Sequence, residues 1–176
     1  MHLKMFLRIL LIICIFTGCK KDAFQKYEGD FKIKVMLVHP DHSYFVASGD
    51  STKLNLYFNG NQHWNFSRVN GNQFIIAATE NPEIVFFTND FGGIELAHRS
   101  QNAAPTRTYF TIEETEKQSI AIKSVYNSKY LYVPYCEKNG DTWAYDVNLI
   151  ADRTTCLAES AGADTCYCVS SFLLEK

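Results

Sequence analysis

The stretch Ile120–Val133, IAIKSVYNSKYLYV, contains two short alternating apolar runs separated by the polar residues Asn127 and Ser128. Alternation with a period of two is typical of β-strands, and Asn and Ser favour tight turns. The stretch therefore predicts a β-hairpin. Two earlier segments have the same order of strand, polar turn and strand: KIKVMLVHPDHSYFVA at residues 32–47 and FIIAATENPEIVFF at residues 74–87.

Each of these three hairpins is followed by two further apolar runs. The last run of each copy places an aromatic residue in one column, namely Trp64, Phe110 and Phe172. Their spacings are 110 − 64 = 46 and 172 − 110 = 62, so the third copy carries an insertion. The runs before them align as apolar pairs: Leu54 with Leu56, Ile94 with Leu96, and Trp143 with Tyr145.

The chain therefore predicts an all-β domain of three repeats, at residues 31–73, 74–118 and 119–176, each with about four strands. Trp64, Phe110 and Phe172 are expected to share one core. Three such copies resemble a β-trefoil, in which six hairpins are arranged as three that close a barrel and three that cap it. The resemblance covers about Phe31 to Lys176, and IAIKSVYNSKYLYV is most similar to the fascin and fibroblast-growth-factor branch. Another small β-barrel or a β-sandwich is the alternative.

The first 22 residues, MHLKMFLRILLIICIFTGCKKD, have the order of a secretory signal: Lys4 and Arg8, an apolar run, and small residues. The apolar part spans roughly 15 Å, about half of a hydrocarbon core, which disfavours a transmembrane helix. Phe16-Thr17-Gly18-Cys19 resembles a bacterial lipobox, although Leu is usual where Phe16 stands. The resemblance implies a signal peptide at residues 1–18, a lipid such as palmitate on Cys19, a tether at residues 19–30, and a domain at residues 31–176 anchored to the bacterial cell envelope, at the outer membrane or cell surface. An ordinary signal peptide with a chance cysteine is the alternative.

Composition argues against several classes of function. The chain has 17 Lys and Arg residues against 19 Asp and Glu residues, and no basic run follows Lys21. Binding to nucleic acid is therefore not expected, because neutralising phosphates requires clustered cations. The sequence has no Gly-x-Ser-x-Gly, His-Glu-x-x-His or phosphate-loop pattern. We expect a monomer that is not an enzyme and has no cofactor.

The cysteines support an extracytoplasmic location. If Cys14 leaves with the signal and Cys19 carries lipid, an even set remains: Cys136, Cys156, Cys166 and Cys168. Disulfides explain such a set better than zinc outside the cytoplasm. Cys166 and Cys168 are too close in sequence to bridge each other in a strand, so each is expected to pair with Cys136 or Cys156, in an order left open. The bridges would shape the insertion of the third repeat.

One short motif suggests a ligand. Asn61-Gln62-His63-Trp64 resembles the Asn-Gln-x-Trp run of ricin-type lectins. In that family the Asn contacts a sugar hydroxyl, the Gln and Trp mainly hold the structure, and a preceding aromatic residue stacks on the sugar. Tyr57 or Phe58 lies at about that place here. An aromatic ring and an amide suit the apolar face and polar edge of a pyranose.

The motif is incomplete in this chain. Such lectins place an Asp near the end of the second strand of the copy, where this chain has Phe45-Val46-Ala47 and reaches Asp50 only later. The other two copies lack the Gln-x-Trp pattern, so at most one sugar site is expected, with Asn61, Gln62, Tyr57 and Asp50 as its candidates. Trp64 is expected in the core.

Metal binding is not expected. His39 and His42 flank a Pro-Asp turn, and His63 and His98 have no partner at a ligand spacing. The sequence therefore favours a glycan-binding module held at a membrane by lipid. The alternative is a protein-binding or inhibitory module that uses the disulfide-shaped loop of the third repeat.

Overall fold

The structure, a computed structural model, describes residues 22–36, 43–48, 52–58, 60–101, 104–115, 118–138, 141–144, 147–150 and 165–176. The predicted signal peptide at residues 1–18, the lipidation site Cys19, the ligand candidate Asp50 and the predicted disulfide cysteine Cys156 lie outside these residues, as do the side chains of Cys136 and Cys166. The all-β prediction is confirmed, since the described residues form no helix longer than four residues.

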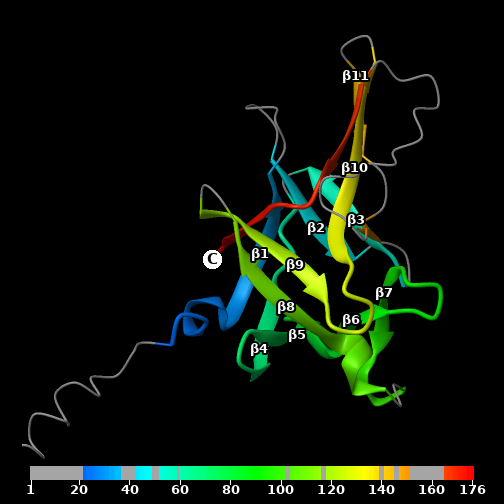
Figure 1. The fold of residues 1–176 in the computed structure, drawn as a ribbon. Coiled ribbons are helices and arrows are strands. Elements are labelled where there is room, and N and C mark those ends of the chain that lie inside the picture. The colour runs from blue at the N-terminus through cyan, green and yellow to red at the C-terminus, as the bar shows by residue number, and fades with distance from the viewer. Residues whose placement is uncertain are drawn as a thin grey trace, which may run out of the picture.

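The described part of the chain contains fourteen strands and three short 3-10 helices (Figure 1). The helices are η1 (Gln25–Tyr27), η2 (Arg99–Gln101) and η3 (Pro105–Thr108). The strands are β1 (Gly29–Val35), β2 (Tyr44–Ser48), β3 (Leu54–Phe58), β4 (Trp64–Asn70), β5 (Gln73–Ala78), β6 (Asn81–Thr88), β7 (Ile94–His98), β8 (Tyr109–Glu114), β9 (Ile120–Ser124), β10 (Tyr130–Lys138), β11 (Asp141–Ala144), β12 (Asn148–Ile150), β13 (Thr165–Val169) and β14 (Phe172–Glu175).

Six strands close into a ring through antiparallel pairings. β1 pairs with β4, β4 with β5, β5 with β8, β8 with β9, β9 with β14, and β14 again with β1. The other strands form hairpins that branch from the ring: β2 with β3, β6 with β7, and β10 with β11, β12 and β13. Closure leaves no free edge within the ring, which allows strands of four to seven residues to be stable.

The register of the ring repeats three times. Trp64 on β4, Phe110 on β8 and Phe172 on β14 are each 0% exposed. Each aromatic residue pairs with residues on two of the three strands β1, β5 and β9. Each of these three strands carries two such partners, four residues apart. The pairs are Trp64 with Phe31 and Ala78, Phe110 with Phe74 and Ser124, and Phe172 with Ile120 and Val35. The differences 35 − 31, 78 − 74 and 124 − 120 are all four, so the three aromatic residues occupy equivalent interior positions.

The third hairpin differs from the sequence alignment. β10 pairs Leu131 with Leu149 on β12, as β2 pairs Val46 with Leu56 and β6 pairs Phe86 with Leu96. The alignment of Trp143 and Tyr145 with the other copies was therefore wrong. Buried Val147 and Leu149 take that place.

The physical reason lies in the insertion of the third copy. β10 continues past Val133, and its far end pairs with β11 and β13 instead of the capping strand. This three-stranded extension projects from the body of the molecule (Figure 1). The chain returns to the hairpin only at β12, so an alternating run with aromatic residues occurs where the repeat leads one to expect the core strand.

Candidate functional site

The connection from β3 to β4 carries the lectin-like motif, and two of its residues hold the structure. The Gln62 Oε1 accepts hydrogen bonds from the Ser48 backbone N–H at 2.7 Å and from the Ser48 hydroxyl at 2.9 Å. The indole Nε1–H of Trp64 donates to the Val46 carbonyl at 2.8 Å. Both side chains therefore fix the connection to β2, and neither the Gln62 oxygen nor the Trp64 N–H is left for a ligand.

The other two candidates of this motif face solvent. Tyr57 is 46% exposed and Asn61 is exposed, and neither side chain forms a hydrogen bond with another described residue. The Gly60 N–H donates to the Tyr57 carbonyl at 3.3 Å, which turns the chain directly after β3. We call Tyr57 and Asn61 the Tyr57 site.

Gly60 keeps the Tyr57 site compact. A Cβ at this position would lie 3.2 Å from the Tyr57 Cβ and 3.3 Å from the Phe45 Cβ, closer than most Cβ contacts. A larger residue would therefore push the connection away from the ring of Tyr57. An exposed phenol ring can stack on a sugar face, and an exposed amide four residues further along the chain can bind hydroxyls.

A second exposed cluster was missed by the sequence analysis. Phe91 is 96% exposed and Tyr126 is 45% exposed. Arg107 links Tyr126 to the turn that carries Phe91: its Nη2 donates to the Tyr126 hydroxyl at 3.2 Å, its guanidinium lies 4.7 Å from the centre of the Tyr126 ring, and it forms an ion pair with Asp90, the residue before Phe91. The hydrogen bond to Asp90 raises the pKa of Arg107 above its ordinary value. We call Asp90, Phe91, Arg107 and Tyr126 the Phe91 surface.

The turn that presents Phe91 is well ordered by hydrogen bonds. The Asn89 N–H donates to the Gly93 carbonyl at 3.0 Å, and the Asn89 Oδ1 accepts from the Gly93 N–H at 2.9 Å. Gly92 has a φ of +77°, a backbone conformation that a residue with a Cβ rarely adopts. The sequence NDFGG at residues 89–93 could have indicated an exposed Phe91, because an aromatic residue inside a tight turn with two glycines cannot pack into the core.

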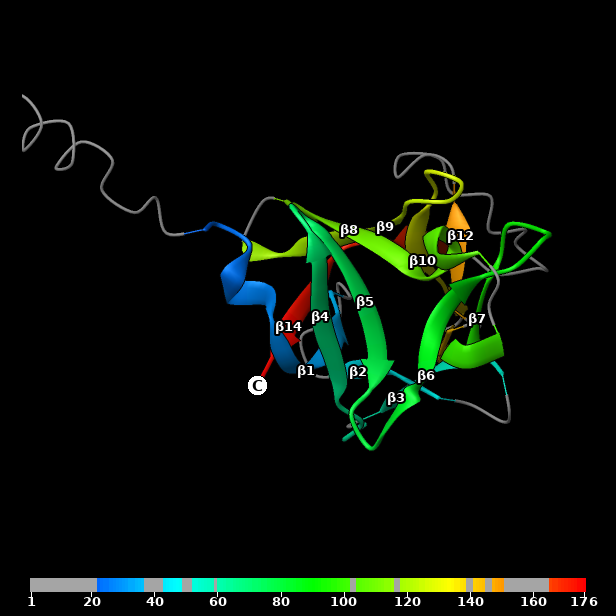
Figure 2. The same cartoon turned by 90° about the horizontal axis from the view of Figure 1, so that it is seen from below.

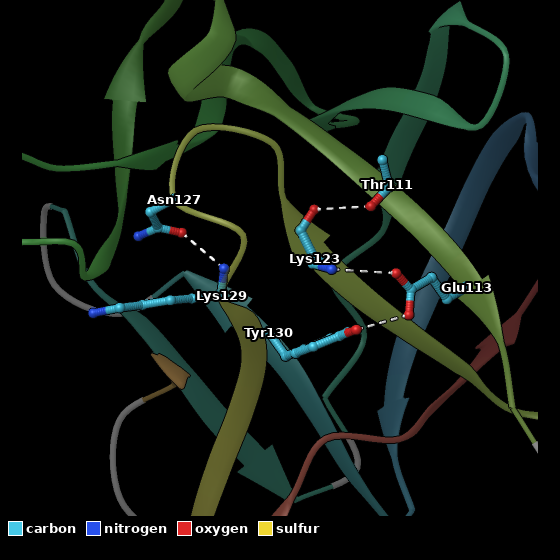
Figure 3. A network of polar contacts seen from close by, with 6 residues as sticks. All are labelled: Thr111, Glu113, Lys123, Asn127, Lys129 and Tyr130. Carbon is cyan, nitrogen blue, oxygen red and sulfur yellow. Dashed lines mark hydrogen bonds and ion pairs between the residues drawn. The ribbon is translucent and has the colours of Figure 1, made fainter. Parts of the chain in front are cut away.

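Neighbouring polar side chains serve the fold (Figure 3). The Asn127 amide donates to the Gly92 carbonyl at 3.2 Å, and its oxygen accepts from the Lys129 N–H at 3.0 Å. On the adjoining sheet face, the Tyr130 hydroxyl donates to Glu113 at 3.0 Å, and Lys123 lies 3.7 Å from the same carboxylate. Asn127 lies in the turn predicted from the sequence, and the arrangement of these side chains stabilises the contact between β8, β9 and β10.

A cavity of about 620 Å³ lies at one end of the ring, beside η1. Its wall combines apolar and polar residues: Lys26, Tyr27, Phe31, Glu114, Thr115, Gln118, Ser119, Ile120, Leu173 and Leu174. The Lys26 ammonium contacts the Glu114 carboxylate at 2.6 Å, and the Tyr27 hydroxyl donates to it at 2.9 Å. The hydrogen bond from Lys26, and to a lesser degree that from Tyr27, lowers the pKa of Glu114 from its ordinary value. The pair of Lys26 and Glu114 therefore remains charged at neutral pH.

The described residues contain no group of three or more His, Cys, Asp or Glu side chains that could hold a metal ion. No helix in the described part of the chain is both long and apolar enough to cross a membrane. No protein-family model matches the sequence, and no curated protein matches it significantly.

Proposed function

We propose that this chain is a non-enzymatic binding module of the β-trefoil type, which binds glycan at the Tyr57 site. The closed six-strand ring and its threefold register support the trefoil assignment. The observation that carries the binding proposal is that some residues of this motif hold the structure while others are exposed to solvent. Gln62 and Trp64 are engaged with β2, whereas Tyr57 and Asn61 are exposed.

The proposal includes the location of the module. We propose that Cys19 carries a lipid and holds the domain at a bacterial envelope, as a monomer without a cofactor. The support is the order of charge, apolar run and small residues in the first 19 residues. Two or three acyl chains on one residue would anchor the module firmly, because each buried methylene contributes about 0.8 kcal/mol.

A glycan array with the chain from Cys19 to Lys176 tests the binding proposal. We expect a restricted set of neutral sugars to bind, and Tyr57→Ala to weaken binding about tenfold because the stacked ring is lost. Tyr126→Ala is the matched control, since Tyr126 is exposed to the same degree, and it should bind as the wild type does. Absence of any bound glycan at millimolar concentration, with both variants folded, would remove the proposal.

The Phe91 surface favours a second candidate function, namely binding of a partner protein. Its combination of an exposed phenyl ring, a tyrosine and an arginine matches the composition of energetic centres in protein interfaces. The ordered turn would lower the entropic cost of binding. The insertion of the third repeat, which the sequence favoured for this role, lies largely outside the described residues.

Site-specific photocrosslinking separates the two candidates. A photoreactive amino acid at position 91 should capture one protein that the same group at Val69, an exposed residue near the end of β4, does not capture. Binding of that purified protein should fall at least about tenfold with Phe91→Ala. Equal crosslinking from positions 69 and 91 would contradict this second function.

A further inference from the structure

The first described residues of the chain do not form a loose tether. Phe24 and Tyr27 are partly buried and pack against the main core cluster. Asp22 and Glu28 both pair with Arg68 near the end of β4, the latter at 3.5 Å. The predicted tether at residues 19–30 is therefore docked on the domain from Asp22 onward.

The contacts of this segment define one end of the ring. Arg68 precedes the β4–β5 turn, and Glu114, the partner of Lys26 and Tyr27, is the last residue of β8. Ion pairs exposed to water contribute little, so the packing of Phe24 and Tyr27 carries most of the docking. Both views of the fold place η1 on the side opposite the connection between β6 and β7 (Figures 1 and 2).

The length of chain outside the docked segment is short. Two residues, Lys20 and Lys21, separate Cys19 from Asp22. Three Cα–Cα steps span at most about 11 Å, whereas a compact domain of this size is about 40 Å across. A lipid on Cys19 would therefore hold the end of the ring beside η1 close to the bilayer.

We infer that this end, formed by η1 and the β4–β5 turn, is a surface that faces the phospholipid headgroups. The inference rests on the anchor at Cys19 included in the proposed function. Among the described residues of this end, Lys26 pairs with Glu114, and Arg68 pairs with Asp22 and Glu28, so the docked face itself suits a zwitterionic headgroup layer. The Phe91 surface is then directed away from the membrane, where a partner can reach it.

Fluorescence quenching on vesicles tests this orientation. The chain from Cys19 to Lys176 is coupled through Cys19, without reductant, to maleimide lipid in phosphatidylcholine vesicles that contain a nitroxide headgroup lipid. A fluorescent amino acid is placed at Val69 next to the β4–β5 turn or at Phe91, both exposed. We expect quenching to be several-fold stronger at position 69, and to be unchanged in high salt, because the tether and not electrostatic adsorption sets the orientation.

A flexible linker of Gly and Ser inserted between Lys21 and Asp22 is the control, and it should remove the difference between the two positions. Equal quenching without the linker, or stronger quenching at position 91, would overturn the inference. Chemical coupling supplies the anchor, so this failure differs from a failure of natural lipidation, which the mass of the native N-terminal peptide reports. The readout also needs no sugar, so it is independent of glycan binding.

Discussion

Trp64→Ala is expected to lower the free energy of unfolding by about 3–5 kcal/mol, as measured by urea denaturation followed by circular dichroism. Trp64 is fully buried, and its ring meets Phe86 edge to face at a centroid distance of 4.7 Å. Removal of the indole would leave a cavity between the ring of strands and the second hairpin. It would also leave the buried carbonyl of Val46 without its donor, which adds to the cost.

Trp64→Phe is the matched control for this prediction. It keeps an aromatic ring at the equivalent position of Phe110 and Phe172 but removes the N–H that binds Val46. A loss of about 1–3 kcal/mol is expected from the missing hydrogen bond and the smaller ring. If Trp64→Ala stayed within about 1 kcal/mol of the wild type, as surface substitutions do, the shared core of the three repeats would be refuted.

Reduction of the disulfides expected from the sequence should have the second largest effect, a loss of about 2–4 kcal/mol in the free energy of unfolding. The register sets Cys136 opposite Cys166, with Cys168 opposite Pro134. A disulfide requires Cβ atoms about 3.5–4.5 Å apart. Directly opposed residues, at about 4.5–5.5 Å, come close to this distance, whereas diagonal residues are farther apart. We therefore propose the pairs Cys136–Cys166 and Cys156–Cys168. Cys168 is disulfide-bonded.

Peptide mapping without reductant, together with urea denaturation before and after reduction, tests the pairing and its contribution. Detection of a Cys136–Cys168 peptide, or of four free thiols in protein produced in an oxidising compartment, would contradict this pairing. A double replacement, Cys136→Ala with Cys166→Ala, should lower stability while it leaves the Cys156–Cys168 peptide intact. Because the bridges lie in the insertion, the ring itself is expected to remain folded in this variant.

Much of the ring could be predicted from the sequence, because strands that line a core alternate apolar and polar residues with a period of two. Alternation in IAIKSVYNSKYLYV predicts the buried side of β9, and Trp64, Phe110 and Phe172 are each buried. The third hairpin could not be predicted in the same way. Trp143 lies in a run that looks like a core strand, but β11 pairs with the extension of β10, and only the pairing of Leu131 with Leu149 reveals the capping strand.

The candidate site could be predicted only in part. The resemblance of Asn61-Gln62-x-Trp64 to a lectin run implied structural roles for Gln62 and Trp64, although their partners lie 14 and 18 residues away in the chain. The Phe91 surface depends on contacts between Asp90, Arg107 and Tyr126, which come from three separate connections. Nothing in the local pattern around Arg107 indicates that its guanidinium stacks on a ring 19 residues away.

Titration of the isotope-labelled domain with a sugar identified on the array tests the central claim most directly. Nitrogen–proton spectra should show saturable shifts of the Asn61 side-chain amide and of the backbone at Tyr57, with no shift at Phe91 or Tyr126. The side-chain signals of Gln62 and Trp64 should not shift, because both side chains stay hydrogen-bonded to β2 throughout the titration. Shifts confined to the Phe91 surface, or none at millimolar sugar, would contradict the assignment of the glycan site to Tyr57 and Asn61.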